Sequence, residues 1–246
     1  ALNTVIAEKV QPNAILVDSE SVENAPRSDL VLLLDDFTEA NGNFQPSYPD
    51  LDDIAAIKFT GGTTGEPKGV LQTHSNMLAV IENMLAFYKF NQSDCNLVIA
   101  PLTHGSSHFI LPILAVGGRH RFLLDRSAES IIGALGSGVT TTFMPPTLIY
   151  KLLDADNLAP ENFNDLRHLT YGAAPMLPAR ISEAQRMFGP CISTIYGQTE
   201  APMMITALTA EEMQDAALCG TVGRSCGNTQ IRIVNEEDAV LPVGTS

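Results

Sequence analysis

Short apolar runs alternate with segments of helical periodicity along most of this chain, and this alternation constrains the fold more than any other feature. The pattern is typical of parallel α/β structure, in which helices connect successive strands and cover the sheet. We predict strands at residues 14–17, 30–34, 54–60, 70–73, 97–100, 121–124, 140–144, 166–170, 192–195 and 229–234. We predict helices at residues 1–10, 76–87, 107–114, 127–135, 146–153 and 178–188, with Ser75 as the N-cap of the second.

The arrangement of these segments predicts how the chain divides. We expect an α/β domain with a doubly wound, mostly parallel sheet and flanking helices over residues 1–205. The start of a β-rich subdomain is expected at residues 206–246, where the pattern becomes more strand-like. The first ten residues resemble the end of an amphipathic helix without a start methionine or an N-cap, which favours a fragment of a longer protein.

Composition excludes several classes of function. The formal net charge is −14, from 14 basic and 28 acidic residues, which argues against nucleic acids and anionic membranes as partners, because both require a basic face. No apolar run approaches the roughly 20 residues that cross a bilayer. The four cysteines form no Cys-x-x-Cys pair, which favours reduced thiols in a cytoplasmic protein. The chain does not indicate an oligomeric state.

A glycine- and threonine-rich segment is the strongest candidate for a phosphate site. Residues 59–69 read Phe-Thr-Gly-Gly-Thr-Thr-Gly-Glu-Pro-Lys-Gly. Closely spaced glycines expose consecutive backbone N–H groups, which bind anions, while hydroxyls and a lysine add further donors. The candidate residues are Thr60, Gly61, Gly62, Thr63, Thr64, Gly65 and Lys68. The segment leads into a strand and lacks Gly-Lys-Ser/Thr, so it is no Walker loop. Taken alone, it is also compatible with an ordinary hairpin tip.

The same segment resembles the phosphate-binding signature of the adenylate-forming superfamily. That superfamily includes acyl-CoA synthetases, aryl-CoA ligases, luciferase-like enzymes and amino-acid adenylation domains. Its Gly-Thr-Thr-Gly-x-Pro-Lys-Gly portion stands intact at residues 62–69, and Gly61 occupies a position that is often Ser. The resemblance implies a fold of the large amino-terminal domain type, with ATP as a substrate.

Two further segments resemble signatures of the superfamily in the expected order. Residues 170–175 resemble the small-residue turn beside the adenine, which assigns Gly172, Ala173, Ala174 and Pro175 to the nucleotide. Residues 195–200 resemble the Tyr-Gly-x-Thr-Glu motif and follow a predicted strand, whose carboxyl end is where open α/β sheets bind ligands. The resemblance implies that Tyr196, Gly197 and Gln198 contact the nucleotide, that Thr199 binds the α-phosphate and that Glu200 binds Mg²⁺.

A partial match indicates the acid-binding end. Residues 100–105 resemble the Pro-Leu-Phe-His turn of acyl-CoA and aryl-CoA ligases, which places His104 near the substrate carboxylate, although Thr103 replaces the usual aromatic residue. Segments 106–111, 143–148 and 172–174 are expected to line the acyl pocket. No acidic residue lies between Thr103 and Phe109, which favours a simple organic acid over an amino acid. Which acid is bound cannot be read from these residues.

The resemblance implies a two-step reaction in which a carboxylic acid is adenylated by ATP and then transferred to coenzyme A. Lys68, His104, Thr199 and Glu200 are the expected catalytic residues. The family's small carboxyl-terminal domain, which carries a further lysine, is absent from this sequence, so we expect this chain alone to be nearly inactive. Two alternatives remain open, namely an adenylation domain that loads a carrier protein and a non-catalytic nucleotide-binding relative.

Overall fold

The computed structural model describes residues 2–26, 28, 30–36, 47–61, 67–156 and 158–245. The chain forms two compact units, which comprise residues 1–72 and 73–246. Among the described residues, no helix combines the length and the apolar character that crossing a membrane requires.

The described part of the first unit contains one α-helix and two small sheets. Its elements are α1 (Leu2–Val10), β1 (Ile15–Val17), the 3-10 helix η1 (Val22–Asn24), β2 (Val31–Leu33), η2 (Leu34–Asp36), β3 (Ile54–Gly61) and β4 (Pro67–Thr73). Strands β1 and β2 pair in parallel, with Ile15 opposite Val31, and β3 pairs with β4. Gly69 on β4 is close to β3, since a Cβ there would lie 3.1 Å from Ile57 Cγ2.

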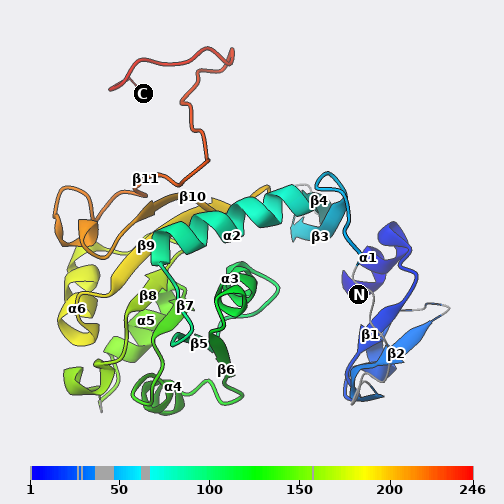
Figure 1. The fold of residues 1–246 in the computed structure, drawn as a ribbon, viewed down its shortest axis with the longest axis horizontal. Helices are drawn as coiled ribbons and strands as arrows, with labels where there is room; N and C mark the ends of the chain where they lie inside the picture. The colour runs from blue at the N-terminus through cyan, green and yellow to red at the C-terminus, as the bar shows by residue number, and fades with distance from the viewer. Residues whose placement is uncertain are drawn as a thin grey trace. The chain divides into compact units, whose positions relative to one another are not determined.

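The second unit is built on a seven-stranded sheet with the order β11-β10-β9-β8-β7-β5-β6 (Figure 1). Its strands are β5 (Cys95–Val98), β6 (Arg119–Phe122), β7 (Thr141–Met144), β8 (His168–Tyr171), β9 (Ile192–Gln198), β10 (Ala201–Leu208) and β11 (Arg224–Ser225). Its α-helices are α2 (His74–Tyr88), α3 (Ile110–Ala115), α4 (Ala128–Leu135), α5 (Pro146–Leu153) and α6 (Pro178–Phe188). The 3-10 helices are η3 (Gly105–Phe109), η4 (Pro160–Phe163) and η5 (Glu212–Gln214). Strands β5 to β9 pair with one another in parallel, while β10 is antiparallel to both β9 and β11.

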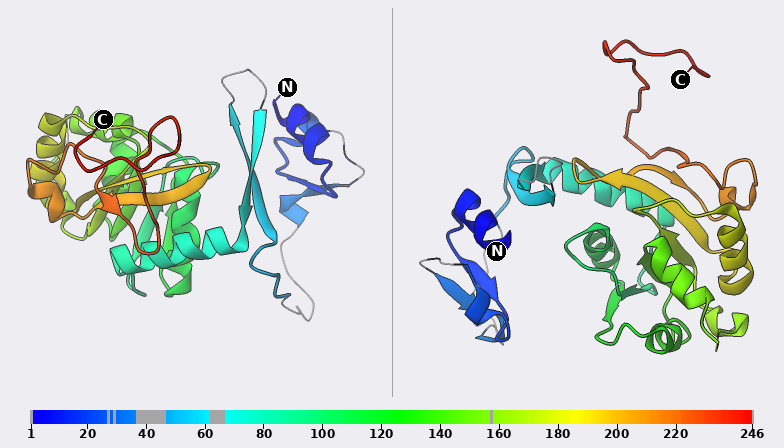
Figure 2. Two further views of the ribbon diagram at one scale, coloured as in Figure 1. Left: turned by 90° about the horizontal axis from the view of Figure 1, so that it is seen from above. Right: turned by 180° about the vertical axis from the view of Figure 1, so that it is seen from behind.

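Two apolar clusters cover the two faces of this sheet. One joins the sheet to α4, α5 and α6, and its fully buried members include Ile131, Ile149 and Ile181. The other joins the sheet to α2, η3 and α3, and it includes Met84 and Phe109. Both views in Figure 2 show α2 running alongside β10, with which it is in contact. Helices on both faces are what parallel strands require, because neither face of such a sheet is left to solvent.

A buried carboxylate ties three strands together at their amino ends. The side chain of Asp94 is fully buried and precedes β5. Its Oδ1 accepts hydrogen bonds from Thr140 Oγ1 and Arg167 Nη1, both at 2.7 Å, and its Oδ2 accepts one from the backbone N–H of Asn91 at 2.8 Å. Thr140 precedes β7 and Arg167 precedes β8, so the carboxylate fixes the starting points of neighbouring strands.

The predicted fold class is confirmed, because the structure is α/β with a mainly parallel central sheet and flanking helices. Three local predictions were wrong. Thr73, rather than Ser75, caps α2, since Thr73 Oγ1 accepts from Asn76 N and Thr73 N donates to Asn76 Oδ1. The helix predicted at 107–114 is a 3-10 helix followed by α3.

The third wrong prediction is the strand at residues 229–234. Its alternating pattern is present, but a strand exists only where a neighbour supplies hydrogen bonds. Within the described part of the chain, this segment makes only an isolated bridge between Val234 and Val240. The division of the chain near residue 205 and the β-rich subdomain beyond it remain predictions.

Candidate functional site

The residues assigned to phosphate binding lie in the first unit. Thr60 and Gly61 end β3, and Lys68 is an exposed residue of β4. Gly62, Thr63, Thr64 and Gly65 lie outside the described residues. The predicted connection between two strands is therefore confirmed at both of its ends, since β3 and β4 pair in one sheet. The role of these residues toward phosphate remains a prediction.

The segment assigned to the adenine follows β8 in the second unit. Gly172 is buried and lies so close to β9 that a Cβ would be 3.0 Å from the carbonyl oxygen of Ile195. Ala173 has a left-handed backbone with φ of 69°, which is uncommon for a residue other than glycine. Residues 173–175 are exposed, and Met176 is buried again. The loop therefore offers a short, small-residue surface between two buried anchors.

The Tyr-Gly-Gln-Thr-Glu motif forms the end of β9 and the turn into β10. Gln198 pairs with Ala201, so residues 199 and 200 form the tip of an antiparallel hairpin. The register then shifts, because Tyr196 pairs with Thr206, and the extra residues of β10 include Met203 at φ of 68°. A Cβ at Gly197 would lie 2.6 Å from the backbone of Met203, so only glycine allows this close approach.

The histidine turn lies against these two loops. A Cβ at Gly105 would lie 3.2 Å from Met203 Sδ and 3.3 Å from Phe143 Cζ, and the same Phe143 ring lies 3.2 Å from the Cβ position of Gly172. The structure therefore brings together the His104 turn, the segment after β8 and the β9–β10 hairpin. His104 itself is exposed, and its Nδ1 lies 2.8 Å from Thr103 Oγ1.

Buried hydroxyls hold the strands beneath the loops in register. Thr170 on β8 and Ser193 on β9 are paired, and their hydroxyl oxygens are 3.0 Å apart. Thr170 Oγ1 also donates to Tyr88 Oη at 3.0 Å, which connects both strands to the end of α2. Burial raises the pKa of Tyr88, so its phenol remains neutral and can serve as an acceptor. One polar cluster thus connects helix α2 to β8 and β9, the strands that precede the two loops.

The donor set at the hairpin tip is compatible with Mg²⁺. Glu200 is exposed there and follows Thr199, so the tip carries a carboxylate beside a hydroxyl. Mg²⁺ is usually held by one or two carboxylates together with substrate phosphates and water, and a single glutamate meets that requirement. No group of three or more His, Cys, Asp or Glu side chains suited to a metal occurs in the described portion of the chain.

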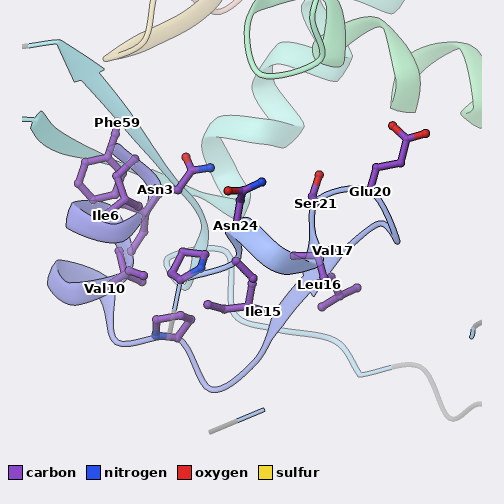
Figure 3. A pocket seen from close by; sticks show the side chains of 15 residues that line it. Asn3, Ile6, Val10, Ile15, Leu16, Val17, Glu20, Ser21, Asn24 and Phe59 are labelled. Atoms are coloured by element: carbon purple, nitrogen blue, oxygen red, sulfur yellow. The ribbon is translucent and has the colours of Figure 1, made fainter. Parts of the chain in front are cut away.

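The first unit contains a cavity of about 600 Å³, and the described residues that line it include none of the predicted site residues (Figure 3). Apolar side chains of α1, β1 and β3, such as Ile6, Ile15 and Phe59, form much of its lining. The described residues that line it include Glu20 but no Lys, Arg or His. The described residues assigned to function belong to the loops of the second unit and, in the first unit, to strands β3 and β4.

The sequence analysis did not identify Met203. A Cβ at Gly105 would lie 3.2 Å from its Sδ, and a Cβ at Gly197 would lie 2.6 Å from its backbone. The left-handed backbone conformation of Met203 cannot be predicted from the residue type, because methionine does not favour it. Pro202 was the available signal, because proline inside a strand pattern indicates an edge or a bulge.

Comparisons with known proteins identify the family of the chain. The characteristic sequence pattern of the AMP-binding enzyme family matches residues 3–246. The chain therefore belongs to the AMP-binding enzyme family. A medium/long-chain-fatty-acid–CoA ligase of Mycobacterium tuberculosis is 32% identical over 177 residues, which cover 72% of this chain and 30% of that ligase. A 2-succinylbenzoate–CoA ligase of Enterococcus faecalis is 32% identical over 78% of this chain and 39% of its own.

Solved structures share the same fold. An amide bond synthetase of Marinactinospora thermotolerans superposes with a TM-score of 0.84 at 25% identity, over 98% of this chain and 52% of the synthetase. Surfactin synthase subunit 3 of Bacillus subtilis, a curated relative, is 25% identical over 92% of this chain and 18% of its own. This chain spans only a part of each of these relatives.

Proposed function

We propose that this chain is part of an enzyme that activates a carboxylic acid with ATP and transfers the acyl group to coenzyme A. The observation that carries this proposal is the meeting of the His104 turn, the segment after β8 and the β9–β10 hairpin around Phe143. All three carry motifs of the family, and the latter two follow the carboxyl ends of parallel strands, where such sheets bind ligands. The CoA ligases among the relatives support the choice of acceptor.

In the first step, a carboxylate oxygen attacks the α-phosphorus of ATP, and the bond from that phosphorus to pyrophosphate breaks. Residues 60–65 and Lys68 hold the departing pyrophosphate through N–H groups, hydroxyls and a cation. Thr199 donates to the α-phosphate, and Glu200 would hold Mg²⁺, whose charge would stabilise the phosphoryl oxygens. Tyr196, which is 43% exposed, presents a ring face to the adenine together with Gly172, Ala173, Ala174 and Pro175. Gly197 and Gln198 also belong to the surface that contacts the adenine.

In the second step, the thiol of coenzyme A attacks the acyl carbon, loses its proton and releases AMP. His104 orients the acid's carboxylate before adenylation. The acyl chain extends past Phe143 and Met203, which border the glycine backbone at residues 105 and 172. The acid is an organic acid without an α-amino group, since residues 104–108 contain no acidic partner for one.

A carrier protein is the alternative acceptor, and the similarity to a surfactin synthase subunit favours it. An assay with each acceptor distinguishes the two functions. The full-length protein that contains this sequence is given either coenzyme A or a phosphopantetheinylated carrier protein, and thioester formation is measured. Thioester formation with coenzyme A alone is the expected result. A protein that shows no pyrophosphate exchange with short, long or aromatic acids would be a non-catalytic relative.

The nucleotide site is tested on this chain by the binding of Mg·ATP in titration calorimetry. Glu200→Gln removes the charge while keeping the shape, and we expect the Kd to rise about tenfold or more at saturating Mg²⁺, because a charge-assisted contact contributes about 1.5–3 kcal/mol. Glu211→Gln neutralises another exposed carboxylate of the same unit and is the matched control. Equal affinity of the Glu200 and Glu211 variants would remove the basis for the metal site.

A further inference from the structure

The segment after β8 needs external support to keep its shape. Ala173 has a φ of 69°, and a left-handed conformation at a residue with a Cβ persists only where the surroundings fix it. Residues 173–175 are themselves exposed, so their own side chains do not bury the loop. The support has to come from the loop's two ends, at Gly172 and at residues 176–177.

The carboxyl end of the loop is held by Tyr150 on α5. The backbone N–H of Leu177 donates to Tyr150 Oη at 3.3 Å. Leu177 is also the N-cap residue of α6, and its carbonyl accepts from the N–H groups of Arg180 and Ile181. The tyrosine hydroxyl therefore binds the peptide at which the loop becomes a helix. The side chain of Leu177 is 67% exposed and cannot provide this anchor by burial.

The ring of Tyr150 is in turn fixed by Arg180. The guanidinium carbon lies 4.8 Å from the ring centroid, in a cation–π arrangement. Arg180 Nη2 donates to Asp154 Oδ1 at 2.8 Å, and Nη1 donates to Glu183 Oε2 at 2.9 Å. One face of Tyr150 is thus covered by a cation that both α5 and α6 hold in place, while the ring packs against the apolar core. The hydroxyl is presented to Leu177 in a defined direction.

We propose that Tyr150 is a positioning residue for the nucleotide. Through the amide of Leu177, its hydroxyl holds residues 173–175 in the conformation that receives the adenine. This inference rests on the proposed function, because it takes the segment after β8 to be the base-binding wall. In this role Tyr150 acts through the hydrogen bond of its hydroxyl to the Leu177 amide, and its effect is transmitted by the loop.

The test is Tyr150→Phe, which removes the hydroxyl and keeps the ring beneath Arg180. We expect the Kd for AMP to rise about three- to tenfold, which corresponds to the loss of one hydrogen bond. The Kd for pyrophosphate, which lacks a base, should stay unchanged, as should the melting temperature within a few degrees. Hydrogen exchange of the Leu177 amide should become faster. Tyr48→Phe, at a side chain that is 90% exposed, is the matched control.

Unchanged AMP affinity in Tyr150→Phe would overturn the inference. An equal loss of affinity for AMP and pyrophosphate would also overturn it, since that result indicates general destabilisation. If the unaltered chain binds neither AMP nor pyrophosphate, the proposed function fails first and the positioning role fails with it. Weaker AMP binding with intact pyrophosphate binding supports both.

Discussion

Asp94→Asn is a demanding test of how the second unit is held together, because it changes charge and leaves shape almost unaltered. Every described partner of this carboxylate is a donor: Thr140 Oγ1, Arg167 Nη1 and the backbone N–H of Asn91. Thr140 Oγ1 already accepts from the N–H of Cys95, so its own hydrogen points to the carboxylate. Asparagine offers one acceptor oxygen, and its NH₂ group has to face one of these donors.

The magnitude follows from burial. The Asp94 side chain is fully buried, whereas the Arg167 side chain is 40% exposed and retains access to water. Asparagine leaves at least one of these donors facing an NH₂ group, and a hydrogen bond to a charged group contributes about 1.5–3 kcal/mol. We therefore expect Asp94→Asn to lower the free energy of unfolding by about 2–4 kcal/mol. Arg167→Gln should cost less, because Thr140 and Asn91 continue to donate to the carboxylate.

The assay is urea unfolding followed by far-ultraviolet circular dichroism, since the chain contains no Trp to serve as a fluorescent probe. A loss of 4 kcal/mol lowers the midpoint by roughly 2 M urea for a typical denaturant dependence. Asp165→Asn, at an exposed aspartate of the same unit, is the control and should change the free energy by less than about 0.5 kcal/mol. A loss below about 1 kcal/mol for Asp94→Asn would refute the reasoning.

Two further predictions concern buried titratable groups. Burial lowers the pKa of His168 to about 4, and its Nε2 is a buried atom without a hydrogen-bond partner. Because this value lies below the unfolded value of about 6.5, the unfolded chain binds the extra proton between pH 6.5 and 4. The contribution of His168 to stability is therefore complete above pH 6.5 and is lost as the pH falls to 4, by about 3 kcal/mol in all. His168→Gln should flatten this part of the stability profile in urea titrations, and an unchanged slope would contradict the assignment. Burial likewise raises the pKa of Cys191 to about 12, and its thiol donates to the carbonyl of Phe188. At pH 8 its thiolate is about a thousandfold scarcer than that of an ordinary thiol, so iodoacetamide followed by mass spectrometry should label it only after unfolding. Rapid labelling of the folded chain would show that the thiol is accessible.

Elements whose ends carry a local signal could be predicted from the sequence. Helices α5 and α6 begin and end where the pattern predicted, because Pro146 and Pro178 fix their first turns. The start of α2 was misplaced, since its capping box uses Asn76 where Glu or Gln is more usual. Strand β10 was missed, because Pro202 and the bulge at Met203 interrupt the regular alternation of a strand.

The candidate site could be predicted only as positions along the chain. Motifs identified Gly172 and Tyr196, and the parallel sheet explains why segments that follow β8 and β9 lie side by side. Which atoms meet was not predictable, because the contact of Gly105 with Phe143 and Met203 depends on packing between distant segments. The hydroxyl of Tyr150 is a further case, since nothing in the helical pattern of α5 relates it to the amide of Leu177.

The left-handed backbone at Ala173 and Met203 limits how this protein can diverge. Valine, isoleucine and threonine are poorly tolerated in that conformation, because a branched Cβ collides with the adjacent peptide. Libraries that seek new acid specificity should therefore offer glycine, asparagine or unbranched side chains at position 203. Side chains of different size are better introduced at position 143. Phe143 belongs to the regular strand β7, and its ring lies between the backbones of Gly105 and Gly172.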